Sequence, residues 1–139
     1  MIVAARAPTL AGGSLRGVSE RDQVARKFML IFRGGAVSRS DLSPTELQAH
    51  VAKWYTWSDE LTRQGRGIVG FPLDNPGVTV RGHDRMVTDG PYAESKDLVT
   101  GSLIISAASL EDAVEVAHSC PTYEYDGSVE VRPVQDGES

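Results

Sequence analysis

Short apolar runs alternate along the chain with polar, glycine-containing segments, and this pattern predicts most of the secondary structure. The clearest run, FMLIF at residues 28–32, lies just before a glycine pair. A run of this length with two aromatic rings favours a β-strand, predicted over 27–33. Further strands are predicted from similar runs and their flanking turn residues at 66–73, 77–82, 84–88, 98–107 and 128–134.

The start of the first helix is the strongest local signal. Ser43 is placed to cap the N-terminus, Pro44 suits the first helical position, and Glu46 completes a capping box. The helix is predicted to run to about Gln64, where Gly-Arg-Gly stops it. Its predicted apolar stripe consists of Leu47, Val51, Trp54 and Leu61, with His50 and Trp57 on one shoulder.

A second helix is predicted to begin after Ser109, with Asp112 as a weaker capping partner, and to close at Pro121. The order of elements is then strand, helix, strands, strand, helix, strand. This order is that of the ferredoxin-like βαββαβ unit, so the predicted fold class is α+β.

The predicted sheet has more apolar surface than two helices can cover. Residues 28–32 and 103–105 are apolar at consecutive positions, so both faces of these strands favour burial. Because one face would lack helices, a second copy of the chain packed sheet to sheet is the expected cover. The sequence therefore predicts a homodimer.

Composition and charge narrow the classes of partner. A chain of 139 residues fits one domain, and its net charge of −5 argues against binding to nucleic acid or to an anionic membrane surface. The single cysteine, Cys120, excludes an intrachain disulfide and fits a reducing, cytoplasmic setting.

The first 26 residues differ in composition from the rest. They are rich in Ala, Arg, Gly and Ser and contain no apolar core of a signal peptide. We expect a disordered extension, or a translated segment upstream of the true start, in preference to a targeting signal. The domain is expected to occupy residues 27–135, followed by a short tail at 136–139.

From Lys27 to Val134 the chain resembles the YCII-related proteins, in particular their DGPF subgroup. The resemblance rests on KFMLIFRGG, LSPTELQAHVAKWYTWSDELTRQG, VTDGPYAESKDLVTGSLIISAASLEDAVEVAHSCP and YDGSVEVRPV. The motif that names the subgroup occurs as Asp89-Gly90-Pro91-Tyr92, with Tyr in place of the usual Phe. The resemblance implies a dimeric α+β barrel built from ferredoxin-like protomers.

The resemblance does not specify a reaction. Relatives include proteins with a proposed His/Asp active site. Many DGPF members are encoded beside extracytoplasmic-function sigma factors, which suggests a regulatory or sensing setting.

Residues 87–97, VTDGPYAESKD, carry more chemical groups than a turn requires. Asp89 can accept backbone hydrogen bonds in the turn, or it can act as a general base or bind a cationic ligand. If the next segment is extended, Tyr92, Glu94 and Lys96 share one side and can bind a polar small molecule. The alternative is an exposed loop with an incidental Glu/Lys pair.

Other candidate residues lie outside this segment. His50 is either a residue packed at the edge of the core or a general base at a pocket wall, where it would pair with Asp89 as in the proposed dyad of relatives. Arg33 is placed to meet a carboxylate ligand or Asp89, and Trp57 is a candidate for the pocket wall. Three scattered histidines and the absence of a nucleotide-binding motif predict no metal site and no cofactor.

The leading interpretation is a homodimer that binds a small molecule, with an accessory role beside a sigma-factor pathway suggested by the resemblance alone. The alternative is an enzyme of lyase, isomerase or hydrolase type. In it Asp89 or His50 would transfer protons, and Tyr92, Lys96 or Arg33 would hold the substrate. A third interpretation is an interaction module with a filled interior and no pocket. Whether the protein is an enzyme stays open at this stage.

Overall fold

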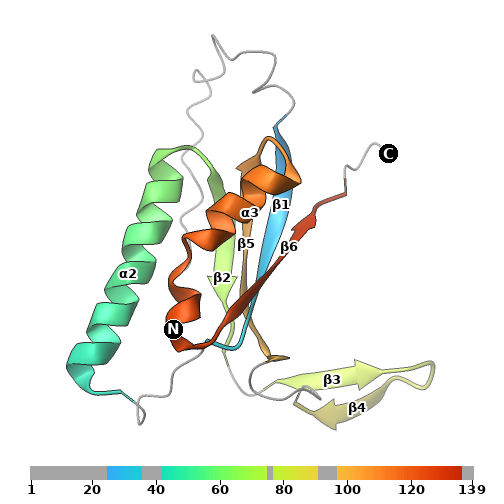
Figure 1. Ribbon diagram of the computed structural model, residues 1–139. Coiled ribbons are helices and arrows are strands. Elements are labelled where there is room, and N and C mark those ends of the chain that lie inside the picture. Colours follow the sequence, from blue (N-terminus) through green and yellow to red (C-terminus); the bar gives the residue numbers. More distant parts are fainter. Residues whose placement is uncertain (1–24, 36–41, 75–76, 91–96, 136–139) are drawn as a thin grey trace.

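The computed structural model describes residues 25–35, 42–74, 77–90 and 97–135 (Figure 1). Six strands, two α-helices and one 3₁₀ helix, η3, lie in these ranges. In chain order they are β1 (Arg26–Arg33), α2 (Pro44–Arg63), β2 (Gly67–Pro72), β3 (Val78–Arg81), β4 (Met86–Asp89), β5 (Val99–Ala107), α3 (Leu110–His118), η3 (Pro121–Tyr125) and β6 (Ser128–Pro133).

Four of the strands form one antiparallel sheet in the order β2-β5-β1-β6. Without β3 and β4, this order and the placement of the two helices are those of a ferredoxin-like unit. Strands β3 and β4 form a separate two-stranded sheet, inserted between β2 and β5. The predicted α+β class is confirmed, and the insertion accounts for the two extra strands of the sequence pattern.

The core lies between the four-stranded sheet and the helices. Along β1, Phe28, Leu30 and Phe32 are buried, while the alternate residues are half-buried, as expected for a strand with one fully covered face. The Phe32 ring meets the rings of Trp54 and Trp57 edge to face, at centroid distances of 5.4 and 6.2 Å. Such ring pairs stabilise a core by about 0.5–1.5 kcal/mol each beyond the area they bury.

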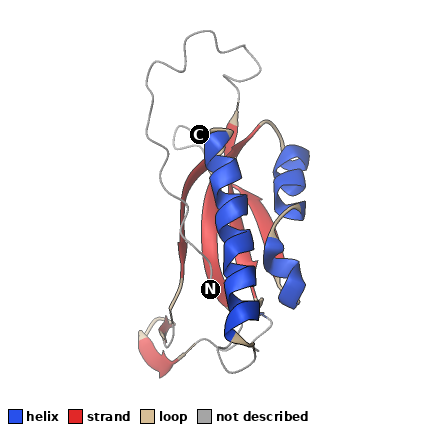
Figure 2. Cartoon of the chain, turned by 90° about the vertical axis from the view of Figure 1, so that its left-hand side faces the viewer, coloured by secondary structure: helices blue, strands red, loops and turns tan. Residues whose placement is uncertain are grey.

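Both helices lie on the same side of the four-stranded sheet (Figure 2). The opposite side, here called the open face, is not covered by any described helix. Strand register places on it Lys27, Met29, Ile31 and Arg33 of β1, Val69 and Phe71 of β2, Ser102, Ile104 and Ser106 of β5, and Glu130 and Arg132 of β6. The prediction that the helices would leave one face of the sheet uncovered is confirmed.

The first helix begins as predicted. Ser43 caps it, the Ser43 hydroxyl accepts the Glu46 backbone N–H at 3.1 Å, and the Glu46 carboxylate accepts the Ser43 N–H at 3.0 Å. The predicted stripe is shifted, however. His50 and Trp57, expected on its shoulder, are buried, whereas Leu47 and Val51 are only half-buried. The buried side of the helix therefore keeps Trp54 and Leu61 of the predicted stripe but includes His50 and Trp57 in place of Leu47 and Val51.

Two predicted boundaries need correction. Helix α3 ends at His118, and Pro121 begins η3 instead of closing the helix. The strand predicted over 84–88 is β4 at 86–89, because residues 82–85 form the turn of the hairpin and Arg85 has a positive φ of 56°. Asp89 is thus the last residue of a strand and precedes the turn at Gly90.

The β3–β4 hairpin projects past one end of the four-stranded sheet (Figure 1). Its register pairs Val78 with Asp89, Thr79 with Thr88 and Val80 with Val87. Backbone and side-chain bonds close its base, where the Gly90 N–H donates to the Gly77 carbonyl at 2.7 Å and the Thr79 hydroxyl donates to the Gly90 carbonyl at 2.9 Å.

Candidate functional site

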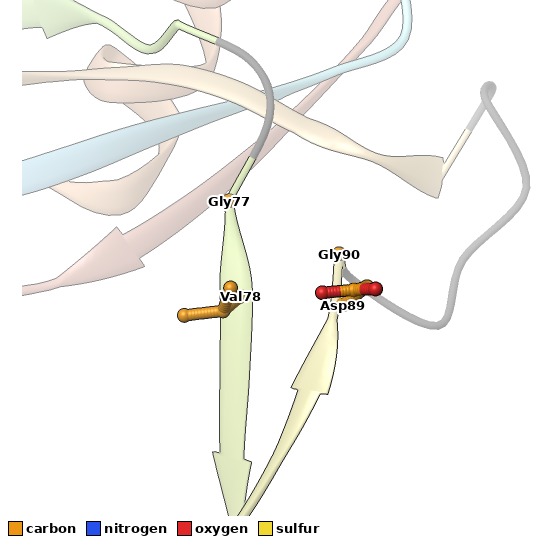
Figure 3. A pocket seen from close by; sticks show the side chains of 4 residues that line it. All are labelled: Gly77, Val78, Asp89 and Gly90. Carbon is orange, nitrogen blue, oxygen red and sulfur yellow. The ribbon is translucent and has the colours of Figure 1, made fainter.

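A cavity of about 650 Å³ opens at the base of the hairpin (Figure 3). Gly77, Val78, Asp89 and Gly90 line it. The paired ends of β3 and β4 hold the Asp89 carboxylate near the glycines that flank the two strands, so backbone, the Val78 side chain and one charged group form the lining. Asp89 is exposed, so its carboxylate is accessible to a ligand that enters from solvent.

Three sequence candidates follow this cavity directly in the chain. Tyr92, Glu94 and Lys96 lie outside the described residues, so their predicted contribution to a pocket stays a prediction. What the structure places at the cavity is the carboxylate of Asp89. A carboxylate of this kind attracts ammonium or guanidinium groups and accepts hydrogen bonds from neutral donors.

His50 lies elsewhere, on the buried side of helix α2, and is 1% exposed. The indole N–H of Trp54 donates to His50 Nε2 at 3.1 Å, and His50 Nδ1 lies 2.8 Å from Glu124 Oε1. An indole nitrogen can only donate, so Nε2 is the acceptor and the ring proton must be on Nδ1. The imidazole is therefore neutral, donates to Glu124, and has a partner on each nitrogen.

Glu124, on η3, joins this histidine to a lysine of α2. Its second oxygen accepts a hydrogen bond from Lys53 Nζ. The hydrogen bond from Lys53, followed by that from His50, holds the pKa of Glu124 below its ordinary value of 4.5. The Tyr125 ring packs edge to face on His50 at a centroid distance of 4.6 Å. This cluster fastens η3 to α2.

The described contacts thus bring His50 to Glu124 and Trp54, and Asp89 to the base of the hairpin. Glu124 was missed by the sequence analysis because it lies 74 positions from His50, beyond any local pattern. The only available signal was the pair of tyrosines that flank it. Both nitrogens of His50 are occupied, so this residue must give up a hydrogen bond before it can accept a proton from a ligand.

The two remaining candidates are also engaged. Trp57 is 9% exposed, packs on Phe32, and donates its indole N–H to the Ser119 hydroxyl at 2.8 Å. Arg33 lies on the open face and pairs with Glu130 at 2.9 Å. Trp57 therefore serves the core in this structure, whereas Arg33 has a side chain that is 33% exposed and can still reach a ligand or a partner.

A smaller hollow of about 380 Å³ lies between α2 and the segment after α3. Ala52, Lys53, Thr56, Ser119 and Pro121 line it. The neighbouring Cys120 is buried, and burial raises the pKa of its thiol to about 12. A thiol of that pKa is almost never a thiolate near neutral pH, so Cys120 is a poor nucleophile.

The described residues contain neither a cluster of metal-ligating side chains nor a helix able to span a membrane. Within it, no group of three His, Cys, Asp or Glu residues is close enough together to hold a metal ion. Neither described helix is both long and apolar enough to cross a bilayer.

Comparison of the sequence with models of known protein families shows to which family the chain is related. The model of the YCII-related domain matches residues 28–137, from the first core strand to beyond the last. The chain belongs to the YCII-related domain family. Both helices, the four-stranded sheet from Phe28 onward, the hairpin and Asp89 all lie within the matched range. A comparison with curated proteins finds no match. In this YCII-related protein the site must therefore be argued from its own residues.

Proposed function

We propose that this YCII-related protein binds a small molecule at the cavity beside Asp89. The cavity at the base of the hairpin carries the proposal, because it combines space with one exposed carboxylate. Its volume of about 650 Å³ is within the roughly 300–1,000 Å³ of known small-molecule sites. The carboxylate favours a ligand with an amino group, another cationic group or several hydrogen-bond donors.

The proposal extends to residues beyond the described ranges. Tyr92, Glu94 and Lys96 follow Asp89 within seven positions and would add a hydroxyl, a carboxylate and an ammonium group to the cavity. These groups would orient a polar ligand that carries both donors and acceptors. The Asp89-Gly90-Pro91-Tyr92 motif supports assignment to the DGPF subgroup, and through that resemblance an accessory or sensing role beside a sigma-factor pathway.

We further propose that the protein works as a cytoplasmic homodimer, built as a dimeric α+β barrel. The open face supports this, since Met29, Ile31 and Ile104 are half-buried there and no described helix lies over them. The single, buried cysteine is compatible with a reducing compartment.

The alternative, a lyase, isomerase or hydrolase, has weaker support from the geometry. A general base needs a free lone pair that faces the substrate, and both nitrogens of His50 are already engaged. Asp89 is the remaining candidate for proton transfer. It is exposed, and the described residues that line the cavity with it are Gly77, Val78 and Gly90, which offer no second side chain for proton transfer, so we favour binding over catalysis.

A thermal-shift screen of small amines, amino acids and organic acids tests the binding proposal. A ligand of the wild-type protein should raise the melting temperature, and Asp89→Asn should abolish that rise. Asp84→Asn is the matched control, because Asp84 is an exposed carboxylate in the turn at the other end of the same hairpin. It should leave the rise unchanged.

Two results would contradict the proposal. One is the absence of any stabilising compound in a broad screen, and the other is an equal rise in Asp89→Asn. If a ligand is found, following it by NMR in the presence of the protein separates the two functions. An unchanged ligand supports binding, and conversion that Asp89→Asn abolishes establishes the enzyme instead.

A further inference from the structure

The β3–β4 hairpin has an apolar side that faces solvent. Val78, Val80 and Val87 share one side with Asp89, and this side is called the valine face. The three valines are 64, 60 and 61% exposed. Thr79 and Thr88, on the opposite side, are only half-buried and hydrogen-bonded to backbone carbonyls. The valines are thus more exposed than the threonines, and on the threonine side Met86 is 63% exposed.

Such an arrangement is unfavourable for an isolated chain. A two-stranded hairpin is at best marginally stable in water and gains stability when an apolar side is covered. The hairpin also projects past the end of its own sheet, so it does not cover the open face of its own chain (Figure 1). No other described strand or helix of the subunit packs on the hairpin to remove the valines from water.

We propose that the valine face of each hairpin packs on the open face of a second copy, so that the two hairpins clasp the dimer. This inference rests on the proposed homodimer and adds to it a specific contact. By two-fold symmetry, each copy gives one hairpin and receives one, which makes the interface self-complementary.

Both faces carry exposed apolar side chains. Phe71 on the open face is 61% exposed, Met29, Ile31 and Ile104 on the same face are half-buried, and Val78, Val80 and Val87 are 64, 60 and 61% exposed. Contact between two copies would remove these side chains from water.

The charges of the two faces are complementary. The open face carries three cations, Lys27, Arg33 and Arg132, and one carboxylate, Glu130, which pairs with both arginines at 2.9 and 3.8 Å. The valine face carries one charged group, the carboxylate of Asp89. A surplus of cations on one face and a carboxylate on the other favour contact between the open face and the valine face.

The clasp has a consequence for the cavity. Because Asp89 lines it and also belongs to the valine face, the cavity would lie at the seam between two copies. The open face of the second copy would then form one of its walls and bring cationic side chains toward it. The ligand site would be complete only in the dimer.

Two neighbouring substitutions test the clasp in the full-length protein. Val87→Glu puts a charge on the valine face, and Met86→Glu puts the same charge on the opposite side of the hairpin at nearly equal exposure, 61 and 63%. Sedimentation equilibrium gives the dimer dissociation constant of each, and circular dichroism verifies that both fold. We expect Val87→Glu to raise that constant by at least about tenfold and Met86→Glu to raise it by less than about threefold.

Three other outcomes would overturn the inference. If both variants dimerise like the wild type, the clasp is wrong while the homodimer stands. If both dissociate equally, the contact is not made by the valine face. If the wild-type protein is itself a monomer, the proposed homodimer fails and the clasp fails with it.

Discussion

Replacing His50 by phenylalanine tests whether this histidine is held as a buried structural group. His50 is 1% and Trp54 2% exposed, and the indole N–H donates to His50 Nε2 at 3.1 Å. A phenyl ring keeps much of the imidazole shape but has no acceptor. The indole N–H of Trp54 would then remain buried without its partner.

The cost follows from the two hydrogen bonds that are lost. A buried donor left without an acceptor costs about 1–3 kcal/mol, and the bond to the Glu124 carboxylate adds less because that side chain is 35% exposed. We therefore expect His50→Phe to lower the free energy of unfolding by about 2–3 kcal/mol. A Trp54→Phe variant has no indole N–H that could lose its acceptor. In that variant His50→Phe should lower the free energy of unfolding by roughly 1 kcal/mol less than in the wild type.

Urea denaturation of the two single variants and the double variant at neutral pH measures these differences. Tyr55→Phe, at a 51% exposed position of the same helix, is the control and should change the free energy of unfolding by less than about 0.5 kcal/mol. If His50→Phe costs as little as the control, or if the two single changes are strictly additive, the buried His50–Trp54 hydrogen bond does not stabilise the fold.

Two more predictions concern η3. The Lys53 hydrogen bond lowers the folded-state pKa of Glu124 from 4.5, so its stabilisation is complete above about pH 4.5 and is lost as the pH falls through the folded pKa. The urea concentration at the midpoint of unfolding should fall on acidification, and it should fall less in Glu124→Gln. An equally steep fall in this variant would show that the Glu124 carboxylate does not cause the loss of stability. Gly127→Ala should cost about 1–3 kcal/mol, because its Cβ would lie 2.8 Å from the Thr122 carbonyl oxygen. Gly77→Ala, whose Cβ meets nothing within 4 Å, is the stability control, and equal thermal shifts for the two would refute the close packing.

The parts of the fold that depend on neighbours in sequence were predictable. The capping box at Ser43 and Glu46 is complete within four residues, and the structure has it as expected. The apolar run at 28–32 similarly predicted a strand with two apolar sides, since alternation of direction along a strand is a local property. The ferredoxin-like order then follows, because few topologies accommodate that sequence of elements.

The contacts between distant elements were not predictable in the same way. The stripe of α2 is shifted toward His50 and Trp57 because Phe32, Glu124 and Ser119, from three other elements, supply partners for those rings. Nothing local to the helix encodes these partners. The position of Asp89 at the end of a strand, beside a cavity, likewise depends on where the 82–85 turn fixes the register of the hairpin.

The mass of the wild-type protein in solution tests the account most directly. Both the cavity at a subunit seam and the clasp of hairpins require a second copy over the open face. Light scattering or sedimentation equilibrium should give a particle of twice the chain mass of 15.0 kDa at working concentration. A particle of 15.0 kDa, with the open face and the valine face in water, would contradict the account.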